Sequence, residues 1–446
     1  MKRLIDTIKN IYKIEDLRIK IINTLAFIAI YRLGSFVVLP GIDPSQLDAL
    51  KDQTSDGLLG ILNMFSGGAF SNASIFALGI MPYISASIVI QLLGIAVPYF
   101  QRLQKDGESG RKKINQITRY LTVIITLFQA PGYIANLISQ VGNQAIANSG
   151  PYFWIQSVII LVSGTMFVMW LGEKITDKGI GNGISLIIMI GIIANLPFAF
   201  TAEFFSRLEQ GGLVAFALEL VILLFVIVMV ILLVQGTRRI PVQFAKKIVG
   251  NKQYGGVRQY IPLKVNAAGV MPIIFAQAIM FIPITIVGFA DVESLTGFAA
   301  TFSDFTGFWY NFTFALLIVL FTYFYTAITV NPNQMAEDMK RNGGFIPGIK
   351  PGKKTAEFID SVMSKITLPG SLFLAFVAIL PAFAMILGVS NQFAQFYGGT
   401  SLLILVGVVL DTLQQIESHL LMRHYDGLMK SGRIKGRSSS PVSMAG

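Results

Sequence analysis

Residues 63–93 read NMFSGGAFSNASIFALGIMPYISASIVIQLL, and this stretch decides the fold. A short apolar run over 58–65 leads into it and is too short to cross a bilayer, which takes about 20 residues. Gly67 and Gly68 let the backbone turn, and a spanning helix over about 75–97 follows, with a kink expected at Pro82. Broken backbone at membrane depth is tolerated only inside protein or beside a water-filled cavity. The stretch therefore predicts a protein wall around a pathway.

The composition is that of an integral membrane protein. Of 446 residues, 53% are hydrophobic and only 13% are charged, whereas a soluble domain carries about 25% charge. The chain has no cysteine, which excludes a disulfide framework, a thiolate nucleophile and a cysteine-based metal site. No cofactor is predicted. The charged start, 1–20, does not have the early apolar core of a cleaved signal peptide.

Hydropathy predicts an all-α protein with ten transmembrane helices, each near the length that crosses the hydrocarbon. The expected spans are 21–39, 75–97, 117–139, 153–171, 184–200, 213–235, 267–289, 309–330, 368–387 and 401–422. Ten spans divide into two five-helix halves. An odd number per half permits an inverted repeat about an axis in the membrane plane, although no letter-by-letter repeat is visible.

The basic residues predict the orientation. Alternate segments, beginning with 1–20 and ending with the tail from 421, hold 32 of the 35 lysines and arginines. Such asymmetry places both termini in the cytoplasm. The expected plan is a cytoplasmic start (1–20), an N-terminal half (21–200), a C-terminal half (201–422) and a cytoplasmic tail (423–446).

Two of the basic segments, 236–264 and 331–368, are longer than a simple connection needs. Gly and Pro punctuate both, and 355–365 is expected to form a short amphipathic helix. Positive-inside charge alone would explain the basicity but not the length. We therefore interpret these segments as docking surfaces for an acidic partner such as ribosomal RNA or a motor protein.

Seven runs of the sequence closely resemble the SecY/Sec61-alpha family, the channel-forming subunits of protein translocons. They are IYRLGSFVVLPGID (30–43), the stretch 63–93, DGESGRKKINQITRY (106–120), GTMFVMWLGEKITDKGIGNGIS (164–185), PLKVNAAGVMPIIFA (262–276), FTYFYTAITVNPNQMAEDMKRNGGFIPGIKPG (321–352) and FYGGTSLLILVGVVLD (396–411). The resemblance extends from about residue 23 to residue 425, in register with all ten spans.

This resemblance implies an hourglass pore between the two halves, a plug, an apolar constriction and a lateral gate between the second and seventh spans. The plug corresponds to about 58–72, with Leu58, Leu62, Met64, Phe65, Ser66, Gly67 and Gly68. The constriction corresponds to a pore ring of Ile80, Ile84, Ile184, Ile188, Ile274 and Ile404. The gate corresponds to Ser85, Ser87, Gln91 and Gln277. The implied function is to pass unfolded secretory polypeptides across the membrane and to release membrane-protein helices sideways into lipid.

A ring of branched alkyl groups suits that function, because it cannot replace the hydration of an ion and excludes water by dewetting. The ring pairs on the second and fifth spans have i,i+4 spacing, so each pair faces one direction. Taken without the resemblance, the same spacing is ordinary for isoleucines that face lipid or pack between helices. The polar groups assigned to the gate likewise have two interpretations. They fit an interface between helices that opens, and they equally fit permanent helix packing, because hydrogen bonds between membrane helices contribute only about 0.6 kcal/mol on average.

The docking candidates are Arg238, Arg239, Arg341, Lys350 and Lys353. Lys350 stands where the family usually carries Arg, so it keeps the charge but loses the planar fork that binds carboxylates bidentately. Coupling to a motor therefore either tolerates lysine or depends more on Arg341 or Lys353.

Three charged residues, Arg32, Glu219 and Asp411, lie at or near membrane depth. Such groups are costly there and usually face protein or water. A proton or ion relay would need a continuous chain of titratable residues across the spans, and none is seen. Structural pairing is the favoured interpretation.

Two other classes of protein fit less well. An intramembrane serine protease is suggested by Gly107-Glu108-Ser109-Gly110, but this short match is in a charged loop far from both histidines, and no phosphate-loop or metalloprotease signature occurs. A secondary transporter shares broken helices and an inverted repeat. A small-solute carrier would line its midplane with converging polar groups, whereas the candidate midplane here is isoleucine.

The chain has no ATP site, so we expect it to supply the path and not the driving force. The resemblance implies SecE as a clamp subunit, SecG in many cases, and the SecA ATPase or the ribosome as engine. Signal-bearing precursors, membrane lipids and SecDF/YidC accessory proteins complete the implied partners. The implied location is the cytoplasmic (inner) membrane.

Overall fold

The computed structural model describes residues 14–44, 47, 63–141, 150–209, 212–244, 247–249, 252–254, 258–277, 279–280 and 306–430. Within them the chain is mostly helical. The helices are α2 (Glu15–Gly34), α5 (Met81–Ala96), α6 (Pro98–Lys105), α7 (Gly107–Val141), α8 (Pro151–Lys178), α9 (Gly183–Glu209), α10 (Leu213–Gln235), α13 (Phe308–Thr329), α14 (Pro332–Arg341), α15 (Lys353–Ile386), α16 (Asn391–Ala394) and α17 (Gly399–Lys430).

Among the described residues, seven helices are long and apolar enough to cross a membrane, or up to eight if the bent pair α5–α6 is one span. α2 covers most of the expected first span. The expected span 267–289 is described as helix over 271–277 and 279–280, and its remainder lies outside the described residues. The helical membrane class predicted from hydropathy is confirmed, because the described chain is mostly helical, with strands only in 237–264 and 344–345. α10 illustrates it, since its middle exposes Val221, Leu224 and Phe225 in the manner of a lipid-facing helix.

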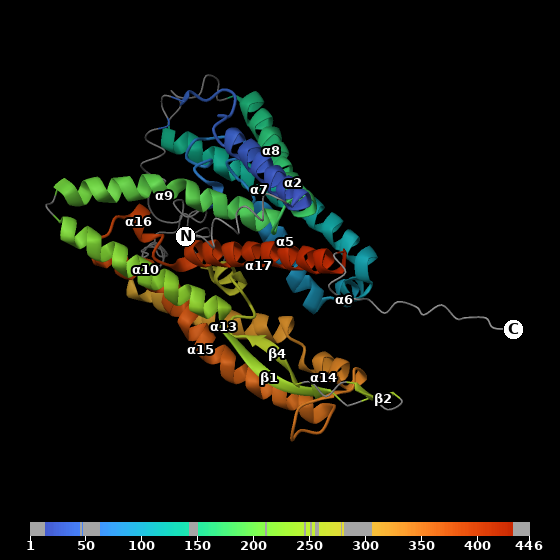
Figure 1. Ribbon diagram of the computed structural model, residues 1–446. Helices are drawn as coiled ribbons and strands as arrows, with labels where there is room; N and C mark the ends of the chain where they lie inside the picture. Colours follow the sequence, from blue (N-terminus) through green and yellow to red (C-terminus); the bar gives the residue numbers. More distant parts are fainter. Residues whose placement is uncertain are drawn as a thin grey trace.

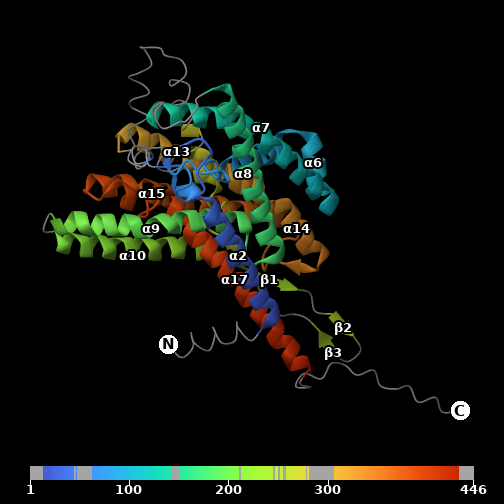
Figure 2. The ribbon, with the colours of Figure 1, turned by 90° about the horizontal axis from the view of Figure 1, so that it is seen from above.

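The two halves of the sequence occupy different regions (Figure 1). α2, α7 and α8 lie above α9 and α17 in this view, and α10, α13 and α15 lie below them, while α5 and α6 pack on α7. α9 and α17 pack against each other between these groups. α9 and α10 follow one another in the chain and lie side by side in both ribbon views (Figures 1 and 2).

The expectation for Pro82 was wrong. The second span does not begin as a helix near Ile75, because residues 67–80 form turns and α5 begins only at Met81. Pro82 therefore stands in the first turn of α5. A proline there lacks an N–H that would have no partner in the helix anyway, and its fixed φ suits helix initiation. It starts the helix and does not kink it.

Two other helices are longer than expected, one at its start and one at its end. The segment expected as a short helix over 355–365 is the first part of α15, which continues unbroken through the next span for 34 residues. α9 likewise runs on to Glu209, so Arg207 lies in a helix and not in a loop. Arg207 pairs with Glu203 one turn before it at 2.9 Å and with Glu219 of α10 at 2.7 Å. The structural pairing expected for Glu219 is thus present.

The two long basic segments meet in one small lobe. β1 (Thr237–Phe244) pairs antiparallel with β4 (Arg258–Lys264) over residues 237–243 and with β5 (Gly344–Phe345) at its end. A separate hairpin joins β2 (Lys247–Val249) to β3 (Lys252–Tyr254). Ile240, Met339, Ile346 and Ile359 bury their side chains in the core of the lobe, between the sheet, α14 and α15. We call β1, β4, β5, α14 and the start of α15 the basic lobe.

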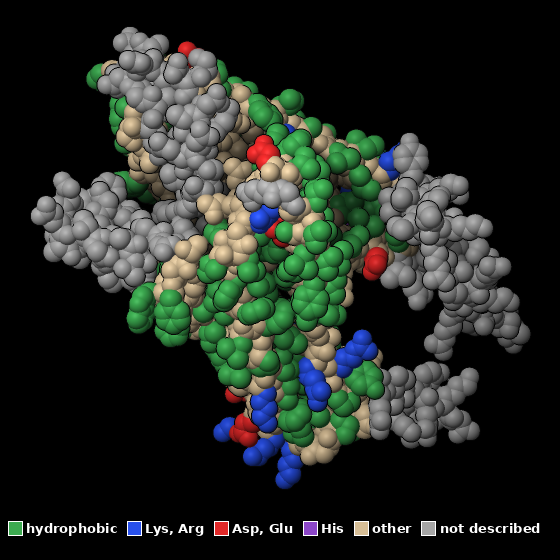
Figure 3. All heavy atoms as spheres, turned by 90° about the vertical axis from the view of Figure 1, so that its left-hand side faces the viewer, with side chains coloured by type: hydrophobic (Ala, Val, Ile, Leu, Met, Phe, Trp, Pro, Cys, Tyr) green, Lys and Arg blue, Asp and Glu red, His purple; other side chains and the backbone are tan. Residues whose placement is uncertain are grey.

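Charge and apolar surface separate along the molecule. In Figure 3, lysine and arginine side chains gather at the lower end, where Figure 1 places the basic lobe. The surface above that end is largely hydrophobic in the same view. This separation is expected of a protein whose middle lies in lipid and whose basic end lies in water.

Candidate functional site

A cavity of about 470 Å³ lies where the two groups of helices meet. Its wall takes side chains from α5, α9, α17, the end of β4 and the segment 266–274. Segments far apart in the sequence therefore converge on one space.

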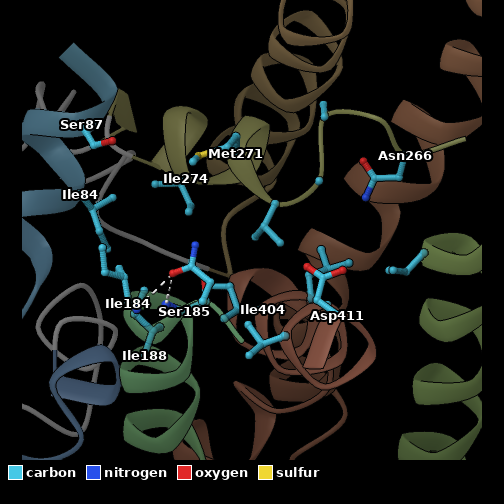
Figure 4. A pocket seen from close by; sticks show the side chains of 18 of the residues that line it. Ile84, Ser87, Ile184, Ser185, Ile188, Asn266, Met271, Ile274, Ile404 and Asp411 are labelled. Carbon is cyan, nitrogen blue, oxygen red and sulfur yellow. Dashed lines mark hydrogen bonds between the residues drawn. The ribbon is translucent and has the colours of Figure 1, made fainter. Parts of the chain in front are cut away.

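Five of the six isoleucines assigned to the ring line this cavity. They are Ile84 on α5, Ile184 and Ile188 on α9, Ile274 in the helix 271–277 and Ile404 on α17. Figure 4 shows these five side chains around the cavity. The sixth, Ile80, directly precedes α5 and is 3% exposed. It is not among the lining residues and belongs to the buried cluster that also holds Ile188 and Ile404.

The fold explains this convergence. Ile184 and Ile188 are one turn apart in the first turns of α9, so both face the same way. The loop before α9 fixes where that helix begins, because Asn182 Oδ1 accepts the backbone N–H groups of Ile184 and Ser185 at 3.1 and 3.4 Å. α17 packs directly on α9, which brings Ile404 to the same level.

The segment assigned to the plug packs in the same buried cluster as Ile80, Ile188 and Ile404. Met64, Phe65 and Ser66 are 4%, 6% and 2% exposed. Leu58 and Leu62 lie outside the described residues. Gly67 and Gly68 have φ of +67° and +86°, a conformation that glycine adopts at no steric cost. The break expected from the sequence is thus a true turn of the backbone.

Four contacts hold this segment in place. The Tyr31 hydroxyl donates to the Ser66 carbonyl at 3.0 Å, and Arg32 donates to the Gly67 carbonyl at 2.7 Å. Ser401 on α17 contacts the Met64 sulfur at 3.1 Å. Gly191 of α9 comes so close that an added Cβ would lie 2.8 Å from the Phe65 carbonyl oxygen. The segment is therefore latched to α2, α9 and α17 at once.

The polar residues assigned to the gate divide into two pairs. Ser87 and Gln91 line the cavity and contact each other at 3.5 Å, and Gln91 Oε1 also accepts a hydrogen bond from the Tyr325 hydroxyl. Ser85 and Gln277 are half-buried and are not among the lining residues. The described structure thus joins the second span to α13, through Tyr325, across 234 residues of sequence.

Tyr325 was not identified from the sequence. It stands in the aromatic run FTYFYTAITV, where nothing distinguishes it from its neighbours. Its ring also lies 6.0 Å from that of Phe275 in the helix 271–277. Tyr325 therefore contacts both α5, through Gln91, and the helix 271–277, through Phe275. These are the two segments that would separate if a gate opened between the second and seventh spans.

The five docking candidates share the basic lobe. Arg238 and Arg239 lie on β1, Arg341 ends α14, Lys353 begins α15 and Lys350 lies in the turn between them. All five side chains are exposed. The Lys350 backbone is fixed, because its carbonyl accepts the Thr355 hydroxyl at 3.0 Å.

The three charged residues expected at or near membrane depth have different surroundings. Arg32 binds the Gly67 carbonyl and lies over the Phe36 ring at 5.3 Å, and Glu219 pairs with Arg207. The ion pairs and hydrogen bonds of the described residues do not include Asp411, which lines the cavity. The pairing expected for Asp411 is thus not seen in the described part of the chain.

The protease alternative finds no support in the described residues. Ser109 is exposed in the first turn of α7, and the described histidine that makes a polar contact, His419, faces Lys20 at 3.4 Å. Within the same residues, no group of three metal-binding side chains occurs.

Comparison with known proteins decides the family. A family model described as SecY matches residues 74–413. A "Protein translocase subunit SecY" from Streptomyces griseus is 45% identical over 432 residues, covering 94% of this chain and 98% of the relative. The chain belongs to the SecY family. A SecY-family relative from Halalkalibacterium halodurans is also 45% identical, over 95% of this chain and 99% of its own.

Solved structures share the SecY fold. One described as "The structure of a protein conducting channel" has a TM-score of 0.59 with 18% identity, covering 90% of this chain and 92% of that one. Another, whose subject is the plug domain of a SecY protein in the closed state, has a TM-score of 0.59 with 17% identity and the same coverage.

Proposed function

We propose that this chain is the channel subunit of a protein translocase, which passes unfolded polypeptides across a membrane and releases apolar segments sideways into lipid. The observation that carries the proposal is the convergence of Ile84, Ile184, Ile188, Ile274 and Ile404 on one cavity, with a buried, latched segment beside it. Membership of the SecY family supports it, since curated relatives are named protein translocase subunits.

An alkyl-lined constriction suits a channel for many different sequences. Isoleucine side chains offer no hydrogen bonds, so they do not select among the side chains that pass. They also cannot replace the hydration of an ion, so the same ring resists ion flow. The segment Met64–Gly68 adds a second barrier in the resting state, because α2, α9 and α17 all hold it.

For sideways release we propose that the seam opens between α5 and the pair formed by 271–277 and α13. Gln91 and Tyr325 join the two sides by a hydrogen bond, and hydrogen bonds between membrane helices are weak, about 0.6 kcal/mol on average. An apolar segment that competes for the seam can therefore separate them. Ser85, Ser87 and Gln277 remain candidate contributors to this gate.

For the driving force we propose that a motor or the ribosome docks on the basic lobe. Arg238, Arg239, Arg341, Lys350 and Lys353 are exposed there, and lysine and arginine side chains gather at that end of the molecule (Figure 3), which favours an acidic partner. In this arrangement both termini and the basic lobe face the cytoplasm of a bacterial cell, and the inner membrane holds the channel. SecE, SecG and the SecA ATPase stay the partners proposed from the family.

Transport into sealed vesicles tests the proposal. The chain is purified with its associated subunits, reconstituted into lipid vesicles and supplied with a motor ATPase, ATP and a signal-bearing precursor. We expect a fraction of the precursor to become protected from added protease, and to lose that protection when detergent is added. Vesicles without the chain are the control. Equal protection with and without the chain would refute the proposed function.

A further inference from the structure

The loop between α8 and α9, residues 179–182, is held by side chains of three different helices. It belongs to no helix or strand, and α9, with two of the ring isoleucines, begins directly after it. The first of the three contacts comes from α8 itself, where Thr176 Oγ1 accepts the N–H of Gly183 at 2.9 Å. The other two come from helices far away in the sequence.

These two distant contacts bind neighbouring N–H groups of the loop. Thr24 Oγ1 of α2 accepts the N–H of Ile180 at 3.1 Å, and Gln415 Oε1 of α17 accepts the N–H of Gly181 at 2.9 Å. Ile180 and Gly181 are buried, and a buried N–H that loses its partner is costly. The position of the loop therefore depends on the positions of α2 and α17.

Close packing joins this loop to the ring. An added Cβ at Gly181 would lie 3.1 Å from Thr412 Oγ1 of α17, and one at Gly172 of α8 would lie 2.9 Å from Ile184 Cγ1. Ile184 follows Gly181 by only three residues. A shift of the loop away from α17 would therefore also displace Ile184, which has little free space on the side of α8.

α17 acts on the ring at two points. Gln415 follows Ile404 by 11 residues, which is about three turns, so it lies on the same face about 17 Å further along the axis. α17 is one continuous helix over this interval and packs on α9. Ile404 faces the same cavity as Ile184 and Ile188 (Figure 4). The helix thus contributes one ring residue directly and holds the start of the helix that contributes two more.

We propose that Gln415 is a positioning residue of the pore ring. Its hydrogen bond to Gly181 holds the start of α9 against α17, so that Ile184 and Ile188 stay level with Ile404. The described lining of the cavity does not include Gln415, so it acts through the loop and not on the polypeptide. Thr24 has the same role from α2. The inference rests on the proposed function, because it requires these isoleucines to form the barrier.

Resting ion conductance of the full reconstituted complex in a planar bilayer is the first readout. Gln415→Leu removes the acceptor, and the Gly181 N–H then regains a partner only if the loop moves to reach water. Conductance should rise about two- to tenfold, the effect of one lost hydrogen bond on that equilibrium. Gln415→Glu keeps the acceptor and should match the parent. Gln414→Leu, turned about 100° around the same helix, is the control and should also match it.

A double-mutant cycle separates positioning of the ring from general loosening of the channel. In a channel that carries Ile184→Ser and Ile188→Ser, the alkyl groups that Gln415 positions are gone, so Gln415→Leu should add no further conductance. A merely structural role would raise conductance by the same factor with or without the two serines. Thr24→Val repeats the cycle from α2, with Thr24→Ser as the variant that keeps the hydroxyl.

Two results would overturn the inference and leave the proposed function intact. One is unchanged conductance with both Gln415→Leu and Thr24→Val in a channel whose conductance the two serines raise. The other is an equal increase with and without the serines. If the two serines themselves leave the conductance unchanged, the constriction on which the proposed function depends is wrong, and the inference fails with it.

Discussion

Gly191→Ala is the sharpest test of how the latched segment is held. The added methyl would lie 2.8 Å from the Phe65 carbonyl oxygen, 3.1 Å from the Gly67 nitrogen and 3.3 Å from the Met64 carbonyl oxygen. All three are backbone atoms of the segment, so no side chain can swing away to make room. Either the segment moves or α9 does.

The magnitude follows from this crowding. Adding a methyl group to a packed interior costs about 1–3 kcal/mol. Alanine also has a higher helix propensity than glycine. Because α9 is helical whether the segment is seated or displaced, this stabilisation is the same in both states and cancels. The equilibrium should therefore shift toward the displaced segment by about 5- to 150-fold.

Two measurements report the shift. The resting ion conductance of the reconstituted channel in a planar bilayer should rise, because the segment is one of two proposed barriers. A disulfide between Met64→Cys and Ser401→Cys, whose side chains touch in the parent, should form in lower yield when Gly191→Ala is added. The engineered pair is unambiguous because the chain has no other cysteine.

Gly132→Ala on α7 is the matched control, because an added Cβ there meets nothing within 4 Å. It changes a helical glycine in the same way without touching the segment. If both variants fold and give the same conductance and the same disulfide yield, the close approach of Gly191 does not hold the segment and the reasoning is refuted.

Four further outcomes are expected. Ile184→Ser with Ile188→Ser should raise resting ion conductance several-fold, because hydroxyls can hydrate the constriction; unchanged conductance would count against the ring. Tyr325→Phe removes the hydrogen bond to the second span, worth about 0.6 kcal/mol, and should increase sideways release of weakly apolar segments about threefold, measured as membrane integration. Lys350→Glu should slow motor-driven transport by tenfold or more through charge repulsion, and unimpaired transport would remove Lys350 from the docking surface. Arg207→Met leaves two buried carboxylates without their cation, so the folded complex should lose about 3–5 kcal/mol, seen as a lower midpoint of thermal unfolding in detergent.

Much of the fold follows from short-range patterns in the sequence. Hydropathy alone indicates most of the spans, and Gly67 and Gly68 indicate the turn. Sequence patterns fail to predict the structure where one residue type has different effects in different positions. Pro82 kinks a helix if it is internal and starts one if it lies in the first turn, and the start of α5 depends on how the segment before it packs.

The site is harder to predict, because its contacts join distant residues. The spacing of Ile184 and Ile188 is ordinary in any membrane helix, and only the resemblance to a family selects them. Tyr325 meets Gln91 across 234 positions. Asn266 follows a strand whose partner begins at Thr237, and its buried Oδ1 has no hydrogen-bond partner among the described residues. No local pattern in the sequence carries that information.

The long helix α15 gives the basic lobe mechanical reach. Its 34 residues correspond to about 51 Å of continuous rod at 1.5 Å per residue, with one end inside the lobe and the rest packed on α13 and α17. A partner that docks on the lobe, as proposed above, would therefore act on a helix that continues into the membrane without an intervening loop. Pro369 and Pro381 lie inside the helix and each removes a backbone hydrogen bond, so bending at these two prolines would limit how far a displacement of the lobe reaches along α15.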